Sequence, residues 1–244
     1  MKILMIPSRM LPIPPVKGGA VQNLINFYIE WNEKEKNNDL IVTSIYNEDA
    51  KNLSSELKNT VIEYTGRHRF LIKLMYKDIP KISGLAHKII NADYKKIIKK
   101  VIRQNKEKLD LVVLDNSTGY FELVRKEFDG KIAIHIYNDH LNSSVKNIDY
   151  IMKNVDRVIT VSEYNSDIVR KLGYGEKVVT LHNGVDISRF GNEYTKGQRN
   201  GIREKLNIKD DEIAIIFVAR LVPEKGIMEL IKAFSKITEY KSIL

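Results

Sequence analysis

Two cationic residues near the end of the sequence have the spacing expected of a diphosphate site. Arg220 follows an apolar run at 213–218 that predicts a buried strand, and Lys225 follows after a short proline-containing turn, just before a predicted helix. A guanidinium offers a two-pronged fork to phosphate oxygens, an ammonium adds a point charge, and a helix N-terminus adds free N–H groups. The position of both cations at a strand's carboxyl end favours diphosphate binding over a simple surface pair with Glu224.

A second candidate is the glycine pair Gly18 and Gly19, which follows the first predicted strand at residues 2–6. Glycines let the backbone approach a ligand closely, and the helix that begins after them would present its N-terminal N–H groups to an anion. A plain turn in a proline-rich loop is the alternative. The sequence contains neither Gly-x-Gly-x-x-Gly nor Gly-x-x-x-x-Gly-Lys-Ser/Thr, so a standard dinucleotide site and a Walker loop are both unsupported.

Short apolar runs that alternate with helical stretches must position these residues. We expect strands at 2–6, 40–45, 60–64, 111–115, 131–137, 157–161 and 177–181. Continuously apolar strands alternating with helices predict an α/β fold, in which a parallel sheet is covered on both faces and binds ligands at its carboxyl edge.

A boundary is predicted after this sheet. The turn Asn183-Gly184-Val185-Asp186, in which Asp186 can cap the following turn, leads into the polar stretch 191–201. A structural corner explains this turn better than direct catalysis does. The pattern then restarts with the strand predicted at 213–218 and an amphipathic helix over 227–237.

The composition excludes several classes of site. The 244 residues include no cysteine, so disulfides, thiolate metal sites and a cysteine nucleophile are excluded. No apolar run approaches the roughly 18 residues of a membrane-spanning helix. The N-terminal segment reads as a buried strand and is too short for a signal peptide, so we expect a cytoplasmic protein.

The net charge of +9 is concentrated in one segment, 67–108, which holds 13 basic and three acidic residues. The basic residues are Arg67, Arg69, Lys73, Lys77, Lys81, Lys88, Lys95, Lys96, Lys99, Lys100, Arg103, Lys106 and Lys108. A localised patch predicts an anionic partner, and a solvated helix face is the alternative. The segment contains no recognised RNA or DNA module and no aromatic stacking face, so we expect no nucleic-acid partner.

Several motifs together resemble glycosyltransferase family 4. They are Gly18-Gly19, Val161-Ser162-Glu163, Asn183-Gly184-Val185-Asp186 with Phe190, and Ala219-Arg220-Leu221-Val222-Pro223-Glu224-Lys225-Gly226. The resemblance implies a retaining, metal-independent enzyme of GT-B fold, with a nucleoside diphosphate sugar as donor and no further cofactor. It implies that Gly18 and Gly19 face the donor phosphates and the acceptor, and that Arg220 and Lys225 bind the donor diphosphate. Two fixed cations would then stabilise the charge on the leaving group.

The catalytic histidine of that family has no direct counterpart here. The family usually carries a histidine at the end of a middle strand, directly before Asn or Asp, whereas Tyr137 stands before Asn138 in this chain. His135 shares a strand face with Tyr137 but lies about 6–7 Å deeper. His140 follows just beyond the strand end. Both histidines are therefore catalytic candidates, with a satisfied structural histidine as the alternative.

The resemblance also implies two glutamates, seven residues apart, beyond the Arg/Lys motif, and the sequence stops at Leu244 before any such pair. We therefore expect residues 1–182 to form a Rossmann-like acceptor-side domain and 183–244 to form a linker and the first strand–helix unit of an incomplete donor domain.

The expected function is transfer of a hexose-type sugar to a carbohydrate or lipid-linked glycan in cell-surface polysaccharide synthesis. The basic segment 67–108 would make peripheral contact with the inner face of an anionic membrane. This chain alone is expected to be inactive because its donor domain is incomplete. A non-catalytic remnant, or a subunit that acts with a partner chain, is the alternative.

Overall fold

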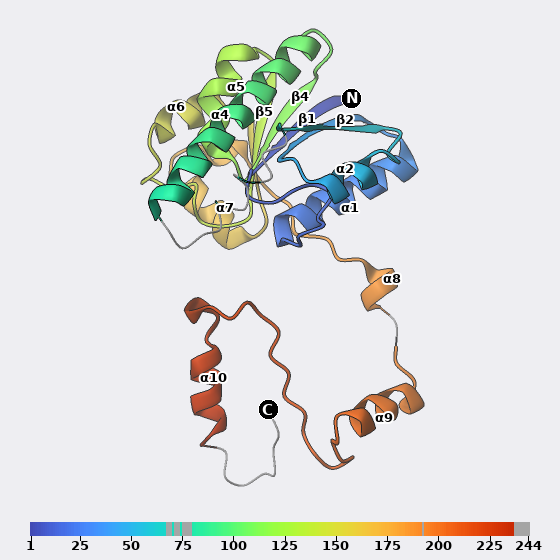
Figure 1. The fold of residues 1–244 in the computed structure, drawn as a ribbon. Coiled ribbons are helices and arrows are strands. Elements are labelled where there is room, and N and C mark those ends of the chain that lie inside the picture. The colour runs from blue at the N-terminus through green and yellow to red at the C-terminus, as the bar shows by residue number, and fades with distance from the viewer. Residues whose placement is uncertain (67–69, 71–73, 75–79, 192, 237–244) are drawn as a thin grey trace. The chain divides into compact units, whose positions relative to one another are not determined.

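The computed structural model describes residues 1–66, 70, 74, 80–191 and 193–236, and the chain divides into two compact units, Met1–Gly184 and Val185–Leu244 (Figure 1). The first unit is built on a parallel sheet with the strand order β3-β2-β1-β4-β5-β6-β7. Its strands are β1 (Lys2–Pro7), β2 (Asp39–Ser44), β3 (Thr60–Tyr64), β4 (Leu111–Asp115), β5 (Lys131–Ile136), β6 (Arg157–Thr160) and β7 (Val178–Thr180). All seven strands expected in this part of the chain are present, with ends that differ by at most one residue.

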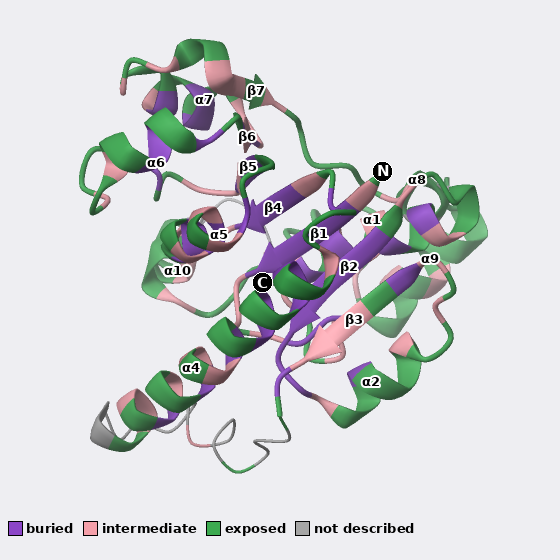
Figure 2. Ribbon diagram, turned by 90° about the horizontal axis from the view of Figure 1, so that it is seen from above, coloured by how far each residue is buried: buried purple, intermediate pink, exposed green. Residues whose placement is uncertain are grey.

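Helices cover both faces of this sheet. They are α1 (Ala20–Glu35), α2 (Glu48–Ser54), α4 (Pro80–Asn105), α5 (Phe121–Glu127), α6 (Ile148–Asn154) and α7 (Glu163–Arg170), with short 3-10 turns η1 (Thr118–Tyr120) and η2 (Gly175–Lys177). Alternate side chains of β1 enter different cores: Leu4 and Ile6 join the core that includes α4 to α7, whereas Ile3 and Met5 join the core beneath α1. The inner strands are accordingly buried along their length (Figure 2). The expected α/β fold with a parallel sheet is confirmed.

The order of the strands reverses between β1 and β4. Strand β1 pairs with β2 on one side and with β4 on the other, in a register that sets Ile3 beside Leu111 and Pro7 beside Asp115. The connections that follow these two strands leave in opposite directions, so their carboxyl ends leave an opening between them. The residues after Pro7 and Asp115 are therefore the first place to look for a site.

A buried tyrosine anchors the longest helix at this edge. The Tyr94 hydroxyl of α4 lies 2.8 Å from the carbonyl oxygen of Pro7 and 2.8 Å from Oγ1 of Thr43. The side chain is fully buried. These hydrogen bonds hold the turn of α4 that contains Tyr94 against the ends of β1 and β2.

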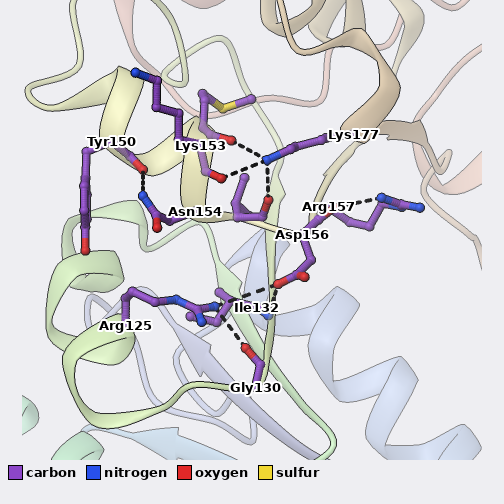
Figure 3. Close-up of polar contacts among 11 residues, drawn as sticks. Arg125, Gly130, Ile132, Tyr150, Lys153, Asn154, Asp156, Arg157 and Lys177 are labelled. Carbon is purple, nitrogen blue, oxygen red and sulfur yellow. Dashed lines mark hydrogen bonds and ion pairs between the residues drawn. The ribbon is translucent and has the colours of Figure 1, made fainter.

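Lys177 binds the C-terminal end of α6 (Figure 3). Lys177 Nζ donates to the carbonyl oxygens of Met152, Lys153 and Val155 at 2.7, 3.1 and 2.9 Å. These carbonyls belong to the C-terminal end of α6, where backbone acceptors lack helical partners and a cation is favoured. Nearby, Asp156 accepts from the Ile132 backbone N–H at 2.8 Å. These contacts join α6 and the start of β6 to their neighbours.

The second unit contains α8 (Ile187–Phe190), α9 (Lys196–Lys205), η3 (Pro223–Lys225) and α10 (Ile227–Phe234). Asp186 caps α8 by accepting from the Ser188 backbone N–H at 2.9 Å, which confirms its expected capping role. Helix α10 confirms the helix expected from residue 227, although residue 237 lies outside the described residues. No described helix is both long enough and apolar enough to cross a membrane.

The strand expected at 213–218 is not formed, and that prediction is wrong. Residues 213–218 pair with no strand in the described part of the chain, and Ile216 and Val218 are 81% and 89% exposed. A strand needs a neighbour to satisfy its N–H and C=O groups and a layer to cover its side chains. The described part of the second unit supplies neither.

Candidate functional site

The loop after β1 delivers two glycines to the start of α1. Gly18 and Gly19 have φ angles of 72° and 104°, a region that residues with a Cβ adopt at a cost. A Cβ on Gly19 would also collide with the side chains of Gln22 and Leu11. Helix α1 has no acidic residue in its first turn and no side-chain cap at Gly19, so its N-terminal end suits an anion electrostatically. The assignment of these glycines to donor phosphates stays a prediction.

The ends of β4 and β5 bring together a buried acid, a histidine and a tyrosine. Asp115 and His135 are register partners, and His135 Nδ1 lies 3.4 Å from Asp115 Oδ2. The Tyr137 hydroxyl lies 3.1 Å from His135 Nδ1 and donates to Asp115 Oδ2 at 3.4 Å. Burial, and then the negative charge of Asp115, raise the pKa of Tyr137, so its hydroxyl keeps its proton near neutral pH.

Two polar atoms of this cluster have no hydrogen-bond partner among the described residues. Asp115 Oδ1 and His135 Nε2 are buried and unpartnered, and Asp115 itself is fully buried. Unsatisfied buried polar groups are costly and call for a partner such as water or ligand. All three side chains line a hollow of about 280 Å3 whose walls are mostly apolar, including Met5, Val113 and Ile159. The cluster can therefore hold one small hydrogen-bonding group or a water molecule.

The two candidate histidines have different environments. His135 belongs to the cluster and is paired with Asp115 and Tyr137. His140 is exposed in the loop after β5, where its backbone N–H donates to Asn138 Oδ1 at 3.2 Å. The structure thus joins His135 to Tyr137, as their shared strand face predicted, and leaves His140 outside the cluster. Neither catalytic assignment is tested by this geometry.

Sequence reasoning missed a cationic hollow at the β1–β4 opening. Arg9 follows β1, and its guanidinium lies 3.1 Å from Asn91 Oδ1 and 3.2 Å from His87 Nδ1. Tyr120 also donates to Asn91 Oδ1, at 2.7 Å. Arg9, Asn91 and Tyr120 line a hollow of about 290 Å3 together with Lys95. The available signal was an arginine directly after the first strand, together with polar residues four apart on one helix face.

The residues predicted to bind diphosphate lie in the second unit. Arg220 is exposed, and its guanidinium is 4.0 Å from the Glu224 carboxylate. Lys225 ends η3, and α10 begins two residues later after Gly226, whose φ is 72°. Both cations therefore precede a helix as expected, although the strand predicted before them is absent. Diphosphate binding by Arg220 and Lys225 stays a prediction.

The described part of the basic segment lies mainly on α4. Arg67, Arg69, Lys73 and Lys77 lie outside the described residues. Half of the exposed cations that follow are paired: Lys100 with Glu63, Lys99 and Arg103 with Glu127, and Lys106 with Asp129. Within the described residues, no group of three or more His, Cys, Asp or Glu side chains could hold a metal ion.

Comparison with known proteins identifies what the chain resembles. Residues 198–243, which include Arg220 and Lys225, match the family model described as glycosyl transferases group 1. Over 98% of its length the chain is 25% identical to YtcC of Bacillus subtilis (strain 168), which carries a provisional glycosyltransferase name. It is 31% identical over 91 residues to alpha-monoglucosyldiacylglycerol synthase of Acholeplasma laidlawii, covering 37% of this chain and 22% of that protein.

A solved structure settles the fold. The chain matches Anabaena Alr3699/HepE, crystallised with UDP and glucose, with a TM-score of 0.61 over 96% of this chain and 57% of that one. The two share a GT-B-like fold. At 16% identity the likeness extends to the fold alone. The chain spans 54% of the length of YtcC and 57% of HepE, about half of each relative.

Proposed function

We propose that the protein is a glycosyltransferase that moves a hexose-type sugar from a nucleoside diphosphate sugar to a carbohydrate or lipid-linked glycan in cell-surface polysaccharide synthesis. The observation that carries the proposal is the position of Arg220 and Lys225 inside the matched stretch 198–243. The binding of UDP by HepE, which has the same fold, supports a nucleotide-sugar donor. Because the chain spans about half of these relatives, the activity is proposed for the protein as a whole.

In the proposed reaction, the bond between sugar and diphosphate breaks and negative charge builds on the departing diphosphate. Fixed cations that meet this charge stabilise the transition state, which is the role we assign to Arg220 and Lys225 in place of a metal ion. The 4.0 Å separation of Arg220 from Glu224, with both side chains exposed, makes their pairing weak. The guanidinium is therefore available to phosphate oxygens. On the acceptor side, His135 and His140 are the proposed catalytic candidates.

The test is binding of UDP to the protein as a whole, measured by calorimetry. Replacing Arg220 and Lys225 together by alanine should weaken binding by about tenfold or more, since hydrogen bonds to charged groups contribute on the order of 1.5–3 kcal/mol. The matched control replaces the exposed α9 residues Arg199 and Lys205, which removes the same charge from the same unit. Equal binding by the two double variants would refute the assignment of the donor site.

We also propose peripheral contact with the cytoplasmic face of an anionic membrane through the first half of α4. Its exposed apolar side chains Ile82, Leu85 and Ile89 are 40%, 61% and 39% exposed, and Lys88 lies among them. Apolar side chains flanked by lysine suit the interface of an anionic bilayer.

Flotation with vesicles tests this contact. Leu85→Ser with Ile89→Ser should release the chain from anionic vesicles, whereas Leu53→Ser in α2, also half exposed, should not. Binding that is unchanged by the α4 substitutions, by salt and by anionic lipid content would contradict the membrane proposal.

A further inference from the structure

A groove lies between α4, α5 and the segment before α6. Its volume is about 810 Å3, and its sides come from Lys95, Lys96 and Lys99 of α4, Lys126 of α5, and Lys146. Helices α4, α5 and α6 pack against a common core on one side of the sheet (Figure 2). The residues that line the groove belong to this side. Three chain segments that are far apart in sequence thus place five lysines around one hollow.

Most of this positive charge is not neutralised. Glu127, one of two acidic residues lining the groove, is already bound to Arg103 at 2.8 Å and to Lys99 at 3.7 Å. The other, Glu122, accepts from Asn147 Nδ2 at 2.5 Å. Within the described residues, Lys95, Lys96, Lys126 and Lys146 have no ion-pair partner, and all four are exposed. Unpaired like charges around a concave surface concentrate anions there.

The lining between the lysines fits sugar rings. Leu123 and Val145 provide apolar surface, whereas Thr118, Asn147 and Glu122 provide polar groups for hydroxyls. A flat bilayer cannot enter a hollow of this kind. Nucleic acid is disfavoured because the one aromatic residue lining the groove, Phe121, is fully buried and offers no stacking face.

The groove lies next to the cationic hollow at the carboxyl edge of the sheet. Lys95 and Gly119 line both spaces. The hollow contains Arg9, directly after β1, and parallel sheets bind their ligands at this edge. A chain-shaped ligand in the groove would therefore have one end at the edge where chemistry is expected.

We infer that this groove binds an acidic glycan, a chain of sugars that carry carboxylate or phosphate groups, and that its end reaches the Arg9 hollow. The groove is an acceptor site only if the proposed function is correct, so the inference rests on that function in this respect. Binding of an acidic glycan to the groove requires no donor. The proposed acceptor is therefore an anionic glycan that lies along the groove, with one end at the Arg9 hollow.

The test measures fluorescence anisotropy of the chain with labelled oligogalacturonate and with a neutral maltooligosaccharide of equal length. The chain should bind the acidic oligosaccharide only, in a salt-dependent manner. Replacing Lys95, Lys96, Lys126 and Lys146 together by alanine should weaken binding roughly tenfold, at on the order of twofold for each exposed contact. The matched control replaces four exposed lysines elsewhere: Lys34, Lys51, Lys58 and Lys171.

Several results would overturn the inference. These are equal binding of the neutral oligosaccharide, an equal loss in the control variant, or groove-dependent binding of anionic vesicles or poly(U) without oligogalacturonate. UDP binding, measured on the same preparation, separates the two proposals. Groove-dependent oligogalacturonate binding without any UDP binding would leave an acidic-glycan site and would count against donor binding by Arg220 and Lys225.

Discussion

The hydroxyl of Tyr94 offers a sharp test of how the sheet edge is held together. It is fully buried and lies 2.8 Å from both the Pro7 carbonyl oxygen and Thr43 Oγ1. Substitution by phenylalanine keeps the ring, which packs against Tyr120 at a centroid distance of 5.5 Å. Only the hydrogen bonds between α4 and the ends of β1 and β2 are removed.

The expected loss of stability comes from the two groups that bind the Tyr94 hydroxyl. Without the phenol oxygen, the Pro7 carbonyl and the Thr43 hydroxyl stay buried and lose a partner, at a cost of about 1–3 kcal/mol in the free energy of unfolding. For a unit of this size, each kcal/mol lowers the melting temperature by about 2–4 °C. We therefore expect Tyr94→Phe to be folded and measurably less stable.

Urea denaturation followed by far-UV circular dichroism provides the measurement. The midpoint should fall while the slope stays constant, because the folded and unfolded surfaces are nearly unchanged. Tyr164→Phe is the matched control, since Tyr164 is 71% exposed and its substitution should leave the midpoint in place. A midpoint for Tyr94→Phe equal to that of wild type would refute the reasoning.

Three further predictions concern other contacts. Gly19→Ala should lower stability by about 1–3 kcal/mol, because its φ of 104° and the nearby side chains both oppose a Cβ; thermal unfolding measures this. Lys177→Met should cost about 1–2 kcal/mol by leaving the end of α6 without its cation, measured by urea denaturation. Arg103 lowers the pKa of Glu127 by its hydrogen bond. Since a depressed carboxyl pKa stabilises the fold above the ordinary value, the difference in urea midpoint between wild type and Arg103→Gln should be present at neutral pH and diminish as the pH falls through the depressed pKa of Glu127.

Each of these predictions has its control and its contrary result. Gly119→Ala, where a Cβ meets nothing within 4 Å, should be nearly neutral, and a loss as large as that of Gly19→Ala would contradict the steric argument. Lys171→Met should leave the midpoint unchanged. A midpoint difference for Arg103→Gln that persisted at pH 3 would show that lost packing, and not ionisation of Glu127, causes it.

Local patterns predicted the sheet well because its strands carry their own signal. Runs such as 111–115 are apolar on both faces and are bounded by polar residues, which leaves a buried parallel strand as the simplest explanation. The run at 213–218 has the same pattern and fails. Its apolar side chains would form a buried strand only against a neighbouring strand and a covering layer. The described part of the second unit contains neither.

The candidate site was harder to predict because its members meet only through the fold. His135 and Tyr137 were connected by the two-residue period of one strand, but the buried partner Asp115 comes from the neighbouring strand. The hollow around Arg9 forms because residues 87–91 of α4 lie against the segment that follows β1. No spacing in the sequence encodes such a meeting.

The pairing of β1 with β4 must wait until the ribosome has synthesised β4. Ile3 pairs with Leu111 and Pro7 with Asp115, so roughly a hundred residues separate the two sides of this ladder. At about 5–20 residues per second, the ribosome needs on the order of 5–20 s to supply the second side. Throughout that interval β1 can pair with β2 but presents an open edge on its other side. Strand β1, an inner strand of the finished sheet, is therefore for several seconds an open edge at which nascent chains can pair with one another.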